Sequence, residues 1–190
     1  MAWGIGGVPR PGSRPATRPL LYVDIDGVLN PAATDTEGFT AHRIGGLTVR
    51  LSPAHGDWLR ELADRYDLVW ATTWEHEANA HVGPLLGLPE LPVVEFSGYQ
   101  RRRDDPRFPI VHLFEMAKWA PILRYADGRP FAWIDDVIPA RIRRQAWPYR
   151  GILLLPVNPR EGLTRRHVDR LLAWPRANRG TGSRRLGQRR

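Results

Sequence analysis

The stretch Leu20-Leu21-Tyr22-Val23-Asp24-Ile25-Asp26-Gly27 decides how the rest of the chain is interpreted. Its four apolar residues, directly after a proline, are typical of a strand that is buried on both faces. Two aspartates at alternate positions follow the strand. In open α/β sheets, binding and catalytic sites lie at the carboxyl ends of the strands. We therefore expect a parallel sheet with a functional site beside Asp24 and Asp26.

Further apolar runs alternate with helical patterns along the chain. Strands are predicted at residues 68–71, 131–134 and 152–155, and an edge strand is predicted at 91–96 because that run contains a proline. Helices are predicted at 53–66, 75–86, 110–125 and 164–174, with Pro121 dividing the third. The pair Gly45-Gly46 between β-forming residues predicts a hairpin within 38–51. This alternation predicts an α/β domain with a mostly parallel sheet.

The positive charge of the chain is concentrated at its two ends. Residues 1–19 contain three arginines and residues 176–190 contain six, and neither segment has an acidic residue. The body, residues 20–175, holds 19 basic and 20 acidic residues. Both ends lack apolar periodicity, so we expect two disordered basic tails around a single domain at 20–175. Such tails can add weak, salt-sensitive contact with nucleic acid, although one lysine against 27 arginines also fits a general bias toward arginine.

The composition excludes several classes of protein and of site. The chain has no cysteine, which excludes disulfide frameworks, thiolate zinc sites and cysteine nucleophiles. No apolar run approaches the roughly 18 residues of a membrane-spanning helix, and the first residues lack the pattern of a secretory signal. With 190 residues the chain can bury a sizeable core in one domain. We therefore expect a cytoplasmic protein without membrane contact.

Three predicted strands end in polar side chains. Asp24 and Asp26 follow the first, Thr72 and Thr73 follow the second, and Asp135 and Asp136 follow the strand at 131–134. Because the carboxyl ends of parallel strands share one edge of the sheet, we expect these side chains to meet. Four carboxylates in one crevice raise one another's pKa unless a cation neutralises them, and Mg²⁺ prefers carboxylate oxygen. Such a site suits a phosphate ester, with one carboxylate as nucleophile and another as general acid/base.

The segment Asp24-Ile25-Asp26-Gly27-Val28-Leu29-Asn30 resembles the first motif of the haloacid dehalogenase-like (HAD) phosphatase superfamily. Thr72 matches the second motif, and Lys118, the only lysine in the chain, stands where the lysine of the third motif belongs. The pair Asp135-Asp136 matches the fourth motif. The resemblance covers roughly residues 20–158. The chain is also similar to actinobacterial HAD-like proteins of undetermined function that carry a Trp-Ala-Thr-Thr-Trp segment, here residues 70–74.

The resemblance implies catalytic roles for the matched residues. Asp24 would be the nucleophile that forms an aspartyl-phosphate, and Asp26 would be the general acid/base. Thr72 would hydrogen-bond the phosphoryl group, with Thr73 as the alternative. Lys118 would pair with Asp24 and with the phosphate.

The resemblance also implies a Mg²⁺ site and a place for the substrate. The implied metal ligands are Asp24, the backbone carbonyl of Asp26, Asp135 and Asp136, the last either as a direct ligand or as a supporting group. Asn30, which ends the first matched segment, and Trp74, two residues after Thr72, are candidates for substrate binding.

The fold that the resemblance implies is a three-layer Rossmann-like core. The stretches between the motifs show no pattern of an independent domain, so we expect a small hairpin flap at 38–51 and no large cap domain. The expected activity is Mg²⁺-dependent hydrolysis of a phosphomonoester of unknown size through an aspartyl-phosphate. The alternative is a nucleic-acid-associated module that uses its arginine-rich tails, either an end-processing phosphatase or a non-catalytic scaffold.

Overall fold

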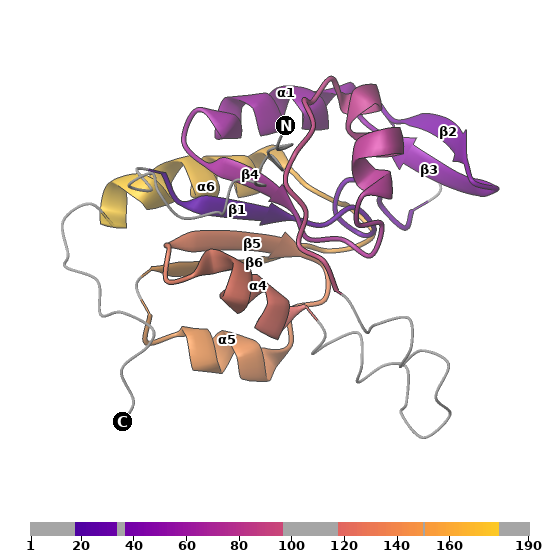
Figure 1. Ribbon diagram of the computed structural model, residues 1–190. Helices are drawn as coiled ribbons and strands as arrows, with labels where there is room; N and C mark the ends of the chain where they lie inside the picture. The colour runs from indigo at the N-terminus through magenta and orange to yellow at the C-terminus, as the bar shows by residue number, and fades with distance from the viewer. Residues whose placement is uncertain (1–17, 34–36, 97–117, 150, 179–190) are drawn as a thin grey trace, which may run out of the picture.

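A parallel sheet forms the centre of the protein, whose computed structural model describes residues 18–33, 37–96, 118–149 and 151–178 (Figure 1). Its four strands are β1 (Leu20–Val23), β4 (Asp67–Trp70), β5 (Phe131–Asp135) and β6 (Ile152–Pro156). They are all parallel and lie in the order β4-β1-β5-β6. A separate antiparallel hairpin consists of β2 (Thr40–Ile44) and β3 (Leu47–Leu51).

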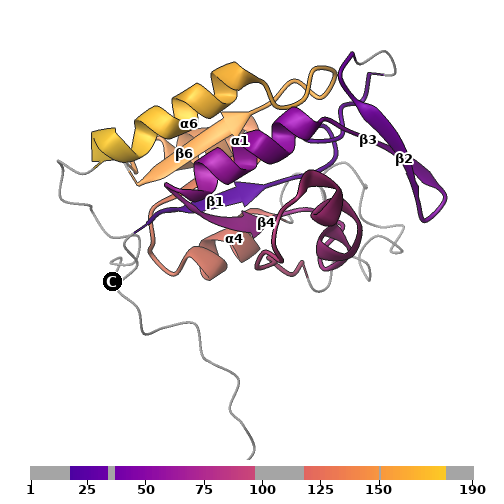
Figure 2. The ribbon, with the colours of Figure 1, turned by 90° about the horizontal axis from the view of Figure 1, so that it is seen from above.

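Helices cover both faces of the sheet. On one face α1 (Pro53–Ala63) and α6 (Arg165–Asn178) lie side by side (Figure 2). On the other face lie α4 (Trp119–Ala126) and α5 (Ala140–Ala146). The short segments η1 (Ala78–Val82), a single π-helical turn, and η2 (Pro84–Leu86), a 3₁₀ turn, follow β4. These three layers confirm the predicted Rossmann-like α/β core with a small hairpin.

The packing of β1 shows why its sequence is apolar throughout. Leu21 and Val23 belong to the apolar cluster under α1 and α6, whereas Leu20 and Tyr22 belong to the cluster under α4 and α5. Alternate side chains of a strand point to opposite faces, so a strand covered on both faces has no position for an unpaired polar residue. The one polar atom, the Tyr22 hydroxyl, donates to the carbonyl of Ile122 at 3.1 Å.

The segment predicted as a helix at 75–86 is broken into turns, η1 and η2. Asn79 explains part of this difference. Its side-chain oxygen accepts from the indole of Trp70 (2.9 Å) and from the amide of Leu91 (3.0 Å), and its side-chain nitrogen donates to the carbonyl of Leu91 (2.7 Å). These three bonds hold the segment against the edge of the sheet, which overrides its local helical preference.

The predicted edge strand at 91–96 is also wrong, because this segment forms only an isolated parallel bridge, between Val93 and Trp70. The amide of Trp70 donates to the carbonyl of Pro92, and the amide of Val94 donates to the carbonyl of Trp70. Pro92 has no N–H to extend a ladder in the other direction. The segment therefore covers the edge of β4 without becoming a fifth strand.

Two helices on one face differ from the sequence-based expectation. α5 was not predicted, because its seven residues include only two buried apolar positions, too few to show a period. Only the last part of the predicted helix at 110–125 falls among the described residues, as α4. Pro121 lies in the first turn of α4, where an amide has no partner within the helix.

The last helix, α6, continues to Asn178, past the predicted end at residue 174. Pro175 lacks the N–H that would bond the carbonyl of Leu171. The hydroxyl of Tyr66 donates to that carbonyl instead, at 2.7 Å. The missing backbone bond is thus replaced from a neighbouring element.

The predicted basic tails fall almost wholly outside the described residues, since the structure describes the chain only between residues 18 and 178. Among the helices that the structure describes, none has the length and apolar character that a bilayer span requires.

Candidate active site

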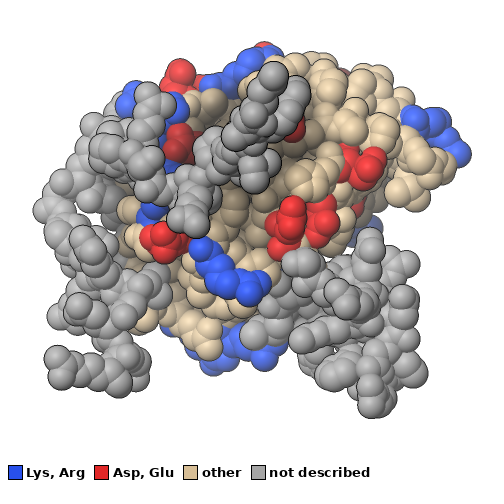
Figure 3. All heavy atoms as spheres, in the orientation of Figure 1, with Lys and Arg blue, Asp and Glu red and all other residues tan. Residues whose placement is uncertain are grey.

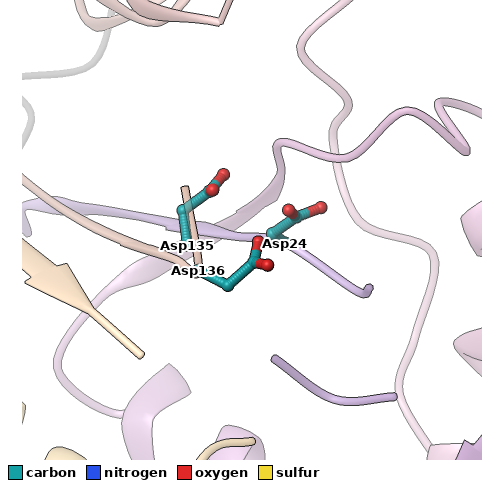
Figure 4. Close-up of side chains that lie close together, drawn as sticks. All are labelled: Asp24, Asp135 and Asp136. Carbon is teal, nitrogen blue, oxygen red and sulfur yellow. The ribbon is translucent and has the colours of Figure 1, made fainter. Parts of the chain in front are cut away.

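Three carboxylates gather at the carboxyl edge of the sheet (Figure 4). Asp24 directly follows β1, Asp135 ends β5, and Asp136 is the next residue. Each offers an oxygen that lies within 4.8 Å of those of the other two. Asp24 and Asp135 are buried and Asp136 is half-buried. The parallel topology thus brings together residues that are more than 100 positions apart, and their hard oxygen atoms form a candidate Mg²⁺ site.

Lys118 lies between two of these carboxylates, just before α4. Its Nζ donates to Oδ2 of Asp24 at 2.5 Å and to Oδ2 of Asp135 at 2.7 Å. Burial by itself lowers the pKa of Lys118, but the charges of Asp24 and Asp135 outweigh it, so the pKa is raised and the ammonium stays charged. The only lysine in the chain therefore supplies positive charge at the predicted place.

Among the described residues, the single positive charge of Lys118 does not balance three ionised carboxylates. Burial raises the pKa of Asp24 to about 7; Lys118 opposes this shift and Asp135 adds to it. Burial and the charge of Asp24 also raise the pKa of Asp136. A divalent cation bound by these oxygens would favour their ionised forms and remove the strain between like charges. The donor set and its charge therefore fit Mg²⁺.

Neighbouring residues that the sequence analysis did not identify hold Asp135 in place and leave room for Asp136. The indole N–H of Trp133 donates to Oδ2 of Asp135 at 3.2 Å, and the amide of Val137 donates to Oδ1 at 2.8 Å. The two-residue period of a strand, which puts Trp133 on the same face as Asp135, is the signal that could have found this contact. Gly27, at φ +72°, leaves room for Asp136, since a Cβ there would lie 2.5 Å from its Cγ.

Asp26 is placed differently from the other three carboxylates. Its side chain is exposed and does not belong to the cluster. Its Oδ2 accepts from the indole N–H of Trp74 and its Oδ1 accepts from the side-chain amide of Asn30, both at 2.9 Å. Among the predicted metal ligands, Asp26 is thus the one whose carboxylate is hydrogen-bonded outside the cluster, to Trp74 and Asn30. The predicted metal contact of Asp26 is through its backbone carbonyl, and this contact stays a prediction.

Both the nitrogen and the oxygen of the Asn30 side-chain amide form hydrogen bonds. Its nitrogen donates to Asp26, and its oxygen accepts from the backbone amide of Arg50 in β3 at 2.9 Å. Its backbone carbonyl also accepts from Gly27. The geometry makes Asn30 a link between the hairpin and Asp26, while the predicted contact of Asn30 with substrate stays a prediction.

The two threonines after β4 have different surroundings. Thr72 is fully buried, and its hydroxyl accepts from the backbone amide of Trp74 at 3.4 Å. Thr73 is exposed and lines a cavity beside Asp26. Thr72 as the phosphate ligand, with Thr73 as the alternative, stays a prediction.

This cavity of about 560 Å³ lies between the tip of the hairpin and the segment after β4. It is lined by Asp26, Ile44, Gly45, Leu47, Thr73, Trp74, Glu75, His76, Glu77 and His81. The sequence analysis identified only Asp26, Thr73 and Trp74 among these as site residues. The hairpin residues carry no chemical signal, because only the fold brings the tip of the hairpin over the end of β4.

A comparison with known protein families matches the part of the chain that contains these residues. Residues 20–168 match the family described as "HAD domain in Swiss Army Knife RNA repair proteins". The chain belongs to this family. A search of the curated proteins and a search of the solved structures found no significant match.

The HAD domain includes all of the candidate site. Its span of residues 20–168 contains the carboxylate cluster, Lys118, the hairpin and the cavity, and it ends within α6. The resemblance to the HAD superfamily is thus confirmed, and membership supports a HAD-type hydrolase.

Proposed function

We propose that this HAD domain is a Mg²⁺-dependent phosphomonoester hydrolase with Asp24 as its nucleophile. The observation that carries the proposal is the cluster of Asp24, Asp135 and Asp136 around a single ammonium group, that of Lys118. Mg²⁺ held by the three carboxylates would neutralise the phosphate of the substrate and draw it toward Asp24.

The proposed chemistry divides hydrolysis into two displacements. A carboxylate oxygen of Asp24 attacks phosphorus, and the bond from phosphorus to the leaving oxygen breaks as Asp26 gives that oxygen a proton. Asp26 then takes a proton from water, whose oxygen attacks the aspartyl-phosphate and releases inorganic phosphate with Asp24 restored. Lys118 balances the charge of Asp24 and of the phosphoryl group, and Thr72 donates its hydroxyl to a phosphoryl oxygen.

The position of Asp26 supports this division of roles. Asp26 lies outside the carboxylate cluster and lines the cavity. The alcohol part of a substrate would lie in this cavity. Hydrogen bonds from Trp74 and Asn30 to its two oxygens hold the carboxylate in one orientation. A general acid must meet the leaving oxygen in a defined geometry, which such bonds provide.

A second candidate function is the removal of a phosphate from the end of an RNA strand. The observation that favours it is the family itself, which is described by its occurrence in RNA repair proteins. Within the described part of the chain, the hairpin is the one small element over the cavity beside Asp26, and no independent cap domain is present, which is compatible with a large substrate. Under this candidate the chemistry at Asp24 is unchanged and only the leaving group differs.

The deciding experiment is hydrolysis of p-nitrophenyl phosphate by the wild type and by Asp24→Asn, with Mg²⁺ and with EDTA. We expect turnover only in the wild type with Mg²⁺, while circular dichroism shows that Asp24→Asn is folded. Asp64→Asn, at an exposed position after α1, is the matched control and should keep full activity. Turnover by Asp24→Asn at the wild-type rate would contradict the assignment.

The same enzyme preparations should then be tested on phosphorylated oligoribonucleotides, with the phosphate at the 3′ end in one series and at the 5′ end in the other. Release of phosphate from one of them with higher kcat/KM than from nucleoside monophosphates would support the RNA-end candidate. Equal values would favour a small-molecule substrate.

A further inference from the structure

We propose that α5 and the residue after it bind single-stranded RNA. The α5 surface consists of Arg141, Arg143, Arg144 and Trp147. The proposal extends the RNA-end candidate by naming where the strand lies. It does not depend on the identity of the nucleophile.

The first argument is the charge of the cavity, which is unsuited to a polynucleotide. Among the described residues that line it, three carry carboxylates (Asp26, Glu75 and Glu77), two are histidines, and none is a lysine or arginine. A second phosphate placed there would meet like charge in a partly enclosed space. The cavity can take the terminal nucleoside of a strand, but the next phosphates must leave the site in another direction.

The second argument is the charge of α5. No acidic residue occurs between Asp136 and Glu161, while all three arginines of α5 are exposed. The opposite side of the helix packs Ile142 and Ala146 into the core, so the arginines lie on its solvent-facing side. In Figure 3 basic side chains gather at the lower edge of the molecule, in the region where Figure 1 shows α5. Several exposed arginines without acidic residues among them attract the phosphates of a nucleic acid backbone.

The third argument is Trp147, whose exposed fraction is 89%. Large aromatic side chains are seldom left this exposed without a partner. Trp147 lies three and four residues after Arg144 and Arg143, so the three side chains are neighbours on the surface. An exposed indole beside two arginines offers a stacking platform for an unpaired base with cations for the flanking phosphates. This combination favours a single strand over a duplex, whose bases are already stacked.

The fourth argument is the place of α5 relative to the site. α5 begins at Ala140, four residues after Asp136, at the carboxyl edge of the sheet. It then runs back toward the amino ends of the strands to reach β6 (Figure 1). A strand whose phosphorylated end lies at the carboxylate cluster can therefore pass along α5, with its last contact at Trp147.

The test measures binding of the full chain to a short fluorescein-labelled oligoribonucleotide by fluorescence anisotropy at several salt concentrations. We expect Trp147→Ala to weaken binding about tenfold. We expect the double variant Arg143→Gln/Arg144→Gln to reduce the slope of log affinity against log salt by about 1.4, because each lost phosphate contact to a single strand contributes about 0.7.

The matched control is the double variant Arg166→Gln/Arg170→Gln in α6. It removes the same charge from exposed positions on the opposite face of the sheet, and both tails remain present. The control should bind like the wild type. Equal weakening by the two double variants would show that binding follows net charge alone and would overturn the proposal.

Two further measurements separate this proposal from its alternatives. Anisotropy measures RNA binding and release of p-nitrophenol measures hydrolysis, so failure of the catalytic assignment and failure of the α5 surface give different results. Vesicles with anionic lipid are the second arm, since arginines and an exposed indole also suit a membrane surface. No RNA binding by the wild type at low salt, or loss of vesicle binding alone in the α5 variants, would overturn the proposal.

Discussion

Asp26 has a neutral hydrogen-bond donor on each of its two carboxylate oxygens, although its side chain is exposed. An exposed aspartate without such partners would rotate freely about its side-chain bonds. Trp74 and Asn30 restrict this rotation and leave the remaining lone pairs of the carboxylate available to the cavity. Trp74, which the sequence indicated as a substrate contact, is therefore also a positioning residue for the proposed general acid/base.

Trp74→Phe tests this role, because it keeps an aromatic ring and removes only the N–H. We expect kcat for p-nitrophenyl phosphate to fall about tenfold with little change in KM, since a hydrogen bond to an exposed charged group is of modest strength. Trp58→Phe, in α1, is the control and should leave kcat unchanged. A rise in KM at constant kcat would instead show that Trp74 contacts substrate only.

His55 is a buried titratable residue that the proposed chemistry does not use. It packs against the rings of Phe39 and Trp58, with centroid distances of 5.3 and 5.4 Å, and its Nε2 is 3.0 Å from the carbonyl of Leu163. Burial lowers the pKa of His55 below its ordinary value of 6.5. The folded protein therefore keeps a neutral His55 under conditions in which the unfolded chain binds a proton.

This difference predicts that the free energy of unfolding falls as the pH drops below 6.5, because protons then favour the unfolded chain. The loss continues down to the lowered pKa of the folded state. Urea denaturation at about pH 7.5 and about pH 5.5 measures it. His55→Gln should reduce the difference between the two conditions, and the exposed His76→Gln should not. An unchanged difference in His55→Gln would contradict the prediction.

At the scale of elements, the hairpin connects the cavity to Asp26. Its tip contributes Ile44, Gly45 and Leu47 to the cavity wall, and its second strand donates the amide of Arg50 to Asn30. The turn depends on two glycines with positive φ, 54° at Gly45 and 83° at Gly46. Such a turn matches the twist of the two strands.

Gly46→Val should deform this turn, because a β-branched residue at φ +83° costs roughly 1–2 kcal/mol. Under the proposed function, the leaving group of a nucleoside monophosphate would lie in the cavity. We therefore expect a several-fold rise in KM for these substrates and a smaller change for p-nitrophenyl phosphate. The matched control is Gly128→Val, which has a similar φ of +79° in the turn between α4 and β5 and open space around its Cβ position. Equal effects of the two variants on KM would contradict a role of the hairpin in binding.

At the scale of the whole molecule, a bound cation should stabilise the fold, because its three ligands come from the ends of two strands and meet only in the native state. A ligand at about 100 times its Kd adds about 2.7 kcal/mol to the free energy of unfolding. For a chain of this size that corresponds to a rise in Tm of roughly 5–10 °C. Thermal melting with Mg²⁺ and with EDTA measures the difference.

Asp136→Asn should reduce this rise in Tm, since it removes a ligand that has no bond to Lys118 among the described contacts. Asp169→Asn, on the exposed side of α6, is the control and should show the full rise. The same rise in Asp136→Asn as in the wild type would place the ion elsewhere on the molecule.

The elements with strong local patterns were predictable because their physical causes lie within a few residues. The four apolar residues of β1, the glycine pair of the hairpin and the apolar run of β5 each carry their own period or turn signal. The segment 75–86 was not predictable in the same way. Its helical pattern is real, but the bonds of Asn79 to Trp70 and Leu91 involve partners nine and twelve residues away.

The sequence by itself determined the parallel α/β core and the residues that meet at its carboxyl edge. The polar residues that follow parallel strands imply that Asp24, Asp135 and Asp136 converge, and the resemblance to the HAD superfamily implies that Lys118 joins them. Only the tertiary structure decided how Asp26 is held, which hairpin residues form the cavity, and that Trp147 is exposed beside the arginines of α5. The physical reason is that strand periodicity is encoded locally, whereas a side-chain hydrogen bond or an exposed ring depends on the elements that pack around it.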